Sequence, residues 1–449
     1  MSRVLLAVAL VFVAQANAQP PQRGSNRTCT VTIRGDHLSG TTLPSGNSLT
    51  HWSGNVRGTC GATMQVRADS GEVNQDAGVS TLIGRARYAD TKEGSTVDAD
   101  RMRYFEGESR IEAVGNVRVR TKSGATLNID QLNYFRPTPS RDYVVIEGAG
   151  HSRLILRDST TVPDSAATTI ESHRIRAERD SMFYAGGSVI ITRPDMRATS
   201  DSAATMSSRR HVRLIGGKPT MVGRGSRAFT ITGTILDVFG KEKAMERLLA
   251  QGKADAVSDS LHLVGDTIDI STSGTKAANS NDVKIDRVAL RGPGRTKASS
   301  PGRDIEGDRI DLSMPGQQLR ELVAVGRALV RTKPDSTIKT TERDWIEGDT
   351  VIARFDTLAK ADSAKQPPLR TLLARGAARS FYHLAPKEPA DSLPTINYVI
   401  GMRIDAAFVK GAVSLVEVFG DVRGVTLEPA RDTAATRRRE PAQPPTSRR

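Results

Sequence analysis

The chain is 449 residues long and carries a formal net charge of +14, with 64 lysines and arginines against 50 aspartates and glutamates. Basic and acidic residues are well mixed and only 4% of residues are aromatic, so the basic patches interleaved with stacking aromatics that mark nucleic-acid binding are missing. This composition argues against a nucleic-acid partner. Beyond the N-terminal segment, no run is apolar enough for a transmembrane helix in the mature chain.

Residues 1–18 have the pattern of a secretory signal peptide. Arg3 supplies a positive charge, residues 4–14 form a short apolar run, and residues 16–18 (Ala-Asn-Ala) are a small-x-small cleavage site. We therefore predict cleavage before Gln19 and a mature protein that is exported and soluble. The alternative is an uncleaved anchor, although the apolar run is too short to span a bilayer well.

Residues 19–80 are rich in Gly, Ser, Thr and Asn and match the rest of the chain poorly, which predicts an irregular N-terminal cap with a few strands. This region holds both cysteines, Cys29 and Cys60. Because an exported chain meets an oxidising compartment, we predict a Cys29–Cys60 disulfide. Two lone cysteines are too few for a structural zinc site, and the seven histidines show no metal-ligand spacing.

Residues 81–428 repeat a phrase of two lines. The first line is small-Asp-x-apolar, as in residues 99–104 and 129–134, or Gly-Asp-x-Ile-Asp, as in 265–269 and 307–311, with Gly-Asp-Thr-Val-Ile at 348–352. The second line is apolar-x-Ala-x-Gly-x-Val-x-Val at residues 111–119, with relatives at 183–191, 248–257, 322–330, 372–380 and 416–425. Alternation with a period of two predicts strands, and a repeat of roughly 35 to 40 residues predicts a stack of similar units. The predicted fold class is all-β, a repetitive β-jellyroll or β-solenoid of short stacked strands.

Two residues of the phrase suggest local roles. A glycine that recurs inside a strand pattern indicates a bulge or bend, so that two sheets fold against each other. The recurring aspartate is interpreted as a cap of the turn into the next strand. One segment, residues 241–251, is a good helix former and predicts a short helical turn that leads into a strand. Residues 429–449 are a Pro- and Arg-rich tail that we predict to be disordered.

The sequence carries no recognisable catalytic motif. It lacks a Gly-x-Ser-x-Gly, a phosphate-binding loop and a dinucleotide-binding glycine pattern placed between a strand and a helix. We therefore expect neither an enzyme nor a cofactor. A β-helix hydrolase that uses paired carboxylates is the alternative, and spacing alone does not exclude it.

The first two copies of the phrase resemble the repeat of the OstA/LptA-like proteins. The resemblance rests on residues 99–104 (ADRMRY), 111–119 (IEAVGNVRV) and 125–134, is best over 82–135 and continues in weaker form to about Leu427. It implies a V-shaped β-jellyroll that carries lipopolysaccharide across the periplasm without a cofactor. It also implies end-to-end contact with similar jellyrolls through exposed edge strands. One member of this family lies in the outer membrane and has a long C-terminal run of amphipathic strands, which this chain lacks.

Alternation assigns one face of the strands to the interior. If the two sheets splay at one edge, that face lines a slot in which each buried methylene of a lipid gains about 0.8 kcal/mol. If the sheets close, the same residues form a packed core and the protein is a closed β-solenoid scaffold that acts through its outer surface. The ten candidate lipid-binding residues are Ile111, Ala113, Val117, Val119, Leu127, Ile129, Val189, Ile191, Leu322 and Val330.

Overall fold

The computed structural model describes residues 31–46, 48–156, 167–179, 182–194, 196–206, 211–224, 228–241, 244–258, 261–273, 284–334, 338, 340–357, 367–384, 393–409 and 412–428. These residues form 26 strands and one short 3-10 helix, η4 (Pro315–Gln317), and no α-helix occurs among them. None of the helical structure in this part of the chain is long and apolar enough to cross a membrane. The all-β fold class predicted from the sequence is confirmed.

The strands follow one another closely along the chain. They are β1 (Val31–Arg34), β2 (His37–Thr42), β3 (Ser48–Cys60), β4 (Met64–Asn74), β5 (Val79–Asp90), β6 (Ser95–Phe105), β7 (Arg110–Arg120), β8 (Thr126–Phe135), β9 (Val145–Leu156), β10 (Thr168–Glu178), β11 (Met182–Thr192), β12 (Met196–Met206), β13 (His211–Ile215), β14 (Thr220–Gly223), β15 (Phe229–Thr232), β16 (Ile235–Lys241), β17 (Ala244–Ser258), β18 (His262–Ser273), β19 (Lys284–Ser300), β20 (Arg303–Ser313), β21 (Glu321–Thr332), β22 (Asp344–Phe355), β23 (Leu369–Leu384), β24 (Thr395–Val409), β25 (Ala412–Phe419) and β26 (Arg423–Leu427).

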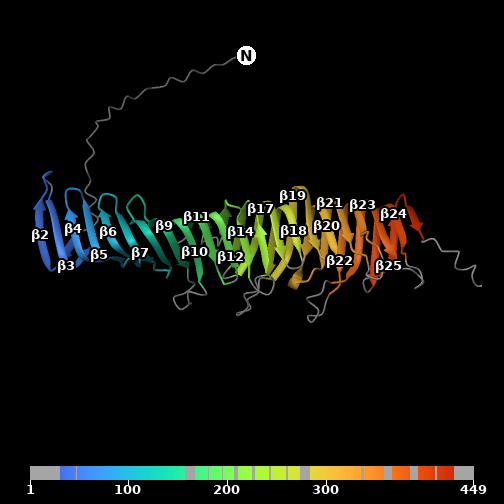
Figure 1. The fold of residues 1–449 in the computed structure, drawn as a ribbon, viewed down its shortest axis with the longest axis horizontal. Coiled ribbons are helices and arrows are strands. Elements are labelled where there is room, and N and C mark those ends of the chain that lie inside the picture. Colours follow the sequence, from blue (N-terminus) through green and yellow to red (C-terminus); the bar gives the residue numbers. More distant parts are fainter. Residues whose placement is uncertain are drawn as a thin grey trace, which may run out of the picture.

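Each long strand pairs in antiparallel fashion with the strands before and after it. β3 to β12 pair in succession, and so do β17 to β24. Between the two runs, β13 and β14 both pair with β12, whereas β15 and β16 both pair with β17. The result is a long stack with β2 near one end and β25 near the other (Figure 1). At about 4.8 Å per strand step, the stack is on the order of 100 Å long.

Every second strand bends near its middle at the glycine of the second sequence line. On β7, Gly115 and Asn116 have φ angles of 81° and 48°, and the pairing register shifts between Val114 and Val117. Positive φ at two successive residues lets the strand bulge and turn a corner, and glycine adopts this conformation at little cost. The bend predicted from the recurring glycine is therefore confirmed. The same pair of positive φ angles recurs at residues 54–55, 84–85, 187–188, 216–217, 252–253, 326–327, 376–377 and 420–421.

The recurring aspartate has a different role from the predicted turn cap. Asp100 on β6 lies beside the bulge of β7 and accepts a hydrogen bond of 2.8 Å from Asn116 Nδ2. Asp130 accepts a bond of 2.8 Å from the backbone N–H of His151, in the bulge of β9. Because the bulge points polar groups away from the ladder, the neighbouring strand supplies the acceptor. The aspartate therefore supports the corner of the next strand.

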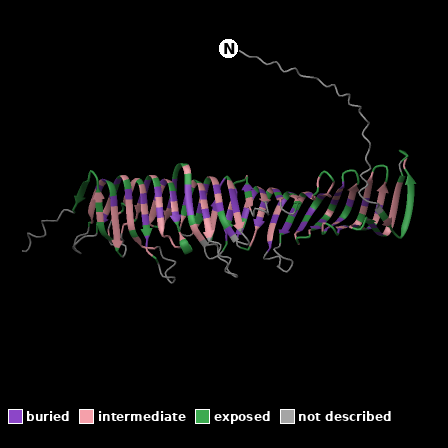
Figure 2. Ribbon diagram, turned by 180° about the vertical axis from the view of Figure 1, so that it is seen from behind, coloured by how far each residue is buried: buried purple, intermediate pink, exposed green. Residues whose placement is uncertain are grey.

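Because each strand turns at the corner, its two halves belong to opposite walls of the stack. We call the wall that contains residues 117–120 of β7 the first arm, and the wall that contains residues 110–114 the second arm. Tyr88 on β5 and Tyr134 on β8 are not neighbours in the sheet, yet their ring centroids are 5.7 Å apart because the arms face each other. Buried residues continue between the arms from β3 to β24, whereas the strands at both ends of the stack are exposed or half-buried (Figure 2).

Two local predictions are wrong in part. The regular, corner-forming strands begin at β3 and β4, so residues 48–74 belong to the stack although the sequence assigned them to an irregular cap. Polar composition hid these strands, whose inward positions still carry apolar residues such as Val56 and Met64. Residues 244–251 lie in β17 and not in a helical turn, because pairing with β16 and β18 outweighs the local helix propensity.

The remaining predictions about the ends of the chain lie outside the described residues. They are the signal peptide at 1–18, the Cys29–Cys60 disulfide, for which Cys29 and the side chain of Cys60 are not described, and the tail at 429–449.

Candidate functional site

All ten candidate residues lie on the inner face of the stack. Their exposed fractions are all 5% or less, and Ala113, Val117, Val119, Val189 and Leu322 are at 1% or below. The alternation within each strand produces this result, because successive side chains point to opposite faces. The register read from the sequence is therefore right. Burial is common to a packed core and a lipid-lined slot, so contact with lipid stays a prediction.

An apolar cavity of about 350 Å³ lies between the two arms at β6 to β12. Its volume is at the lower end of the roughly 300–1,000 Å³ typical of small-molecule sites. Two of the ten candidates, Val119 and Leu127, line it from the first arm. The other apolar lining residues were not singled out from the sequence and come from several strands and both arms: Ala125, Val144, Ile146, Leu154, Leu156, Ile175, Ala177, Met182 and Phe183.

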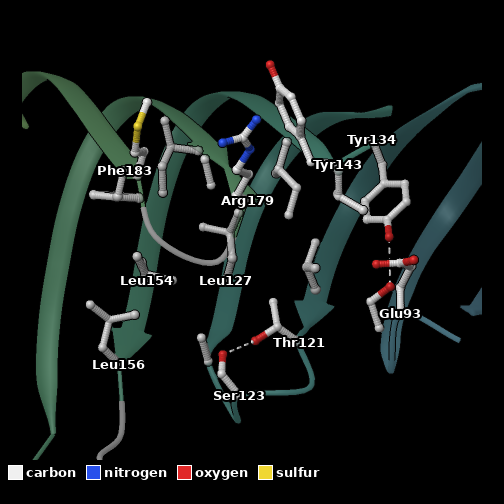
Figure 3. A pocket seen from close by; sticks show the side chains of 18 of the residues that line it. Glu93, Thr121, Ser123, Leu127, Tyr134, Tyr143, Leu154, Leu156, Arg179 and Phe183 are labelled. Carbon is white, nitrogen blue, oxygen red and sulfur yellow. Dashed lines mark hydrogen bonds between the residues drawn. The ribbon is translucent and has the colours of Figure 1, made fainter. Parts of the chain in front are cut away.

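Polar side chains border this cavity where strands end. Figure 3 shows Tyr143 and Arg179 at one border, and Thr121 with Ser123 at the opposite border. The guanidinium of Arg179 lies 4.4 Å from the ring centroid of Tyr143, and the hydroxyls of Thr121 and Ser123 are 2.8 Å apart. Ser123 and Arg179 are exposed, and Leu156 is 37% exposed, so the cavity reaches the surface between the tips of the arms.

On the side toward the N-terminus, a buried polar cluster closes the space between the arms. Tyr134 Oη on the second arm lies 2.8 Å from Ser95 Oγ on the first arm. Tyr88 donates a hydrogen bond of 3.0 Å to Asp90, whose carboxylate lies 3.8 Å from the guanidinium of Arg136. Burial raises the pKa of Tyr134 to about 12 and also raises the pKa of Tyr88, so both hydroxyls are neutral at physiological pH. Ser95 and Tyr134 of this cluster line the cavity.

A second contact joins the tips of the arms farther along the stack. Arg303, at the start of β20, places its guanidinium 4.9 Å from the ring centroid of Phe355, at the end of β22. Burial lowers the pKa of Arg303 because the cation has lost much of its hydration. The two tips are thus in contact at β5–β8 and at β20–β22, and the cavity lies between these places.

A smaller cavity of about 50 Å³ lies near the N-terminal end of the stack. Ile111 lines it, together with residues of β1 and of β3 to β6 that include Ile33, Met64, Tyr88 and Met102. The other seven candidates line neither cavity: Ala113, Val117, Ile129, Val189, Ile191, Leu322 and Val330. The alternation of apolar residues within one strand predicted which side chains point inward. It did not predict at which strands the arms lie far enough apart to leave a cavity.

The ionisable groups of the described part offer no metal site, since no three His, Cys, Asp or Glu residues are grouped there so that they could hold an ion. Many acidic side chains instead pair with arginines on the outer face. Asp237 accepts hydrogen bonds of 2.7 and 3.0 Å from Arg213, and Asp269 accepts two of 2.8 Å from Arg247. These pairs cross neighbouring strands, as expected of a solvated sheet face.

The chain shows only limited similarity to known proteins. No known family matches the sequence, and no curated protein matches it. Among solved structures, the chain is similar to LptH of Pseudomonas aeruginosa, the LptA homologous periplasmic component of its lipopolysaccharide transport device. The identity is 20%, the TM-score is 0.22, and the likeness covers 24% of this chain and 78% of LptH. A TM-score this low carries no weight for function, so the case rests on the residues described above.

Proposed function

We propose that this protein is a non-catalytic periplasmic carrier or bridge that shields the acyl chains of lipopolysaccharide or a similar envelope glycolipid on the way to the outer membrane. The observation that carries the proposal is the apolar cavity between the arms. Its apolar lining would take the acyl chain, and its polar borders at Thr121, Ser123 and Arg179 would remain with the hydrated head group. The repeat phrase resembling OstA/LptA-like proteins supports the choice of cargo.

Binding would follow from the hydrophobic effect alone. Each methylene that leaves water for the lining of the cavity gains about 0.8 kcal/mol, so a chain of ordinary length binds without any charged contact. No bond is made or broken in this scheme, and no cofactor takes part. The energy for directed movement would come from another protein.

The C-terminal end of the stack supports end-to-end contact with a similar jellyroll. β25 and β26 pair only with β24 among the described strands, so their outer edges are open. Leu415, Phe419, Val425 and Leu427 are 46–56% exposed there. An open and apolar edge is a surface to which another strand can add.

A second candidate function is that of a closed envelope scaffold without a lipid slot. The observation that favours it is the fully packed interior around residues such as Leu236, Leu248, Ile268 and Ile310, which have no exposed surface. In this case the cavity is a packing defect, and the protein acts through its outer surface.

Native mass spectrometry of the protein purified from its own periplasm tests the proposal first. We expect a bound species with the mass of a lipid A-type glycolipid. A clean apoprotein mass, with no uptake after purified lipopolysaccharide is added, would support the scaffold.

The site of binding is tested with the fluorescent fatty acid cis-parinaric acid. Ala177→Phe places a ring in the cavity and should weaken binding at least about tenfold, since loss of two methylene contacts already costs about 1.6 kcal/mol. Val114→Phe is the matched control because Val114 is 38% exposed on the outer face of β7. Equal binding by both folded variants would place the probe elsewhere.

A further inference from the structure

A row of arginines runs along the outer face of the first arm, with one residue per strand. The pairing register places Arg34 opposite Arg57, Arg57 opposite Arg67, and Arg67 opposite Arg87. Beyond Asp98 the row continues with Arg118, Asn128 and Arg153. We call the six basic residues of this line the arginine row: Arg34, Arg57, Arg67, Arg87, Arg118 and Arg153.

The arginine row is exposed and only partly neutralised. Arg87 has an ion pair of 3.4 Å with Asp98, and Arg153 has one of 3.7 Å with Glu171. The remaining four have no ion pair with any described residue. Like charges that face each other directly across strands are destabilising. The successive arginines from Arg34 to Arg87 therefore cost stability, and of these only Arg87 has an acidic partner among the described residues.

The second arm shows that this charge pattern is not a general property of the outer face. The equivalent line there runs through Arg103, Glu112, Asn133, Glu147 and Arg176. Arg103 contacts Glu112 at 2.7 Å, and Arg176 contacts Glu147 at 2.8 Å. Charges on the second arm are thus paired, whereas the first arm presents an excess of positive charge.

We propose that the arginine row binds a linear anionic polysaccharide that lies along the stack. Neighbouring strands are about 4.8 Å apart, so Arg34, Arg57, Arg67 and Arg87 start from backbone positions one strand step apart, and Arg118 and Arg153 follow at two-strand intervals. Such a line of cations suits a chain with acidic groups along its length. Arginine binds carboxylate and phosphate with two parallel hydrogen bonds, which favours it over lysine at such a surface. This proposal is independent of the lipid cavity, because it concerns the opposite face of the arm.

The residues that flank the row favour a sugar chain over other polyanions. On the same face, the neighbouring positions toward the tip of the arm are Thr32, Thr59, Gln65, Ala89, Thr96 and Arg120, which are small or able to hydrogen-bond to hydroxyl groups. Binding of single-stranded nucleic acid needs aromatic side chains on which bases stack, and a membrane surface favours apolar groups that insert between lipids. This part of the face offers neither.

The test measures binding of fluorescein-labelled polygalacturonate to the mature protein by anisotropy. The triple variant Arg57→Gln, Arg67→Gln, Arg118→Gln should bind about tenfold more weakly or worse, since three exposed ionic contacts are lost. Because these side chains are exposed and have no partner in the described chain, the variant should melt at the same temperature as the parent or higher.

The matched control carries Lys253→Gln, Lys297→Gln and Lys333→Gln, which remove the same charge from exposed positions outside the row. Its affinity should stay within about twofold of the parent. Equal loss in both triple variants would mean that net charge alone attracts the polymer and would overturn the proposal. Tighter binding of single-stranded DNA or of anionic phospholipid vesicles than of polygalacturonate would also overturn it.

Discussion

Asp100 on β6 occupies the space that a side chain on Gly115 of β7 would need. A Cβ on Gly115 would stand 2.5 Å from Oδ2 of Asp100, and the φ angle of 81° at Gly115 is unfavourable for any other residue. The same arrangement recurs between Asp308 and Gly326 and between Asp349 and Gly376. The aspartate of one sequence line and the glycine of the next thus form one structural unit, the corner.

Gly115→Ala should destabilise the protein by about 1–3 kcal/mol, because it adds both a clash and backbone strain. Gly107→Ala is the control, since its Cβ would meet no atom within 4 Å, and it should change stability by less than about 0.5 kcal/mol. Urea unfolding followed by circular dichroism measures both. Equal effects would show that the corner does not depend on glycine.

Val117→Asp should abolish folding or lower stability by several kcal/mol, because it places a carboxylate at a position that is 1% exposed between the arms. Val119→Asp should behave in the same way. Arg118→Ala, on the outer face between them, should change stability by less than about 0.5 kcal/mol. Thermal melting of the three variants checks the assignment, and a sensitive Arg118 would contradict it.

Tyr134 should make stability fall in alkaline solution. Its pKa is raised to about 12 in the folded protein, against about 10 in the unfolded chain, so its stabilising effect is present below pH 10 and is lost as the pH rises toward 12. Tyr134→Phe should be about 1 kcal/mol less stable at pH 8, for lack of the bond to Ser95, and should lose less stability than the parent above pH 10.

Unfolding by urea at several pH values measures this difference. Tyr184→Phe is the control, because Tyr184 is 37% exposed, and its curve should run parallel to that of the parent. If the alkaline loss were the same in all three proteins, Tyr134 would not be its source.

Asp237 should make stability fall in acid. Burial alone would raise the pKa of this carboxyl, but hydrogen bonds from Arg213 and His211 outweigh burial and lower the pKa. A lowered pKa stabilises the fold above the unfolded value of about 3.9, and the effect is lost as the pH falls through the folded value. Asp237→Asn should therefore cost about 1–3 kcal/mol at pH 7 and much less below pH 4.

Asp421→Asn is the matched control, since it removes the same charge from an exposed residue in the turn after β25. Denaturation by guanidinium chloride at pH 7 and pH 3 gives the comparison. A cost of Asp237→Asn that does not change with pH would mean that the carboxylate charge has no part in it.

The sequence alone determined the all-β fold class, the corners and the inner face. Side chains alternate with a fixed period of two, so the apolar positions of β7, β8, β11 and β21 identify the interior without knowledge of the partner strand. A glycine at a fixed place in each repeat likewise marks a local backbone conformation, because few other residues adopt positive φ. Helix propensity gave the wrong structure at residues 244–251, because pairing with the two neighbouring strands β16 and β18 makes this segment a strand.

Only the tertiary structure decided which residues of different strands come together. The cavity depends on the distance between the two arms. Leu154, Ile175 and Phe183 line it from three different strands, and no pattern within one strand encodes how far apart the arms lie. The arginine row depends on register, since Arg34, Arg57, Arg67 and Arg87 are unevenly spaced in the chain and align only through the hairpins that join their strands. Alternation fixes the face of a residue, whereas turn length and bulges fix its neighbour.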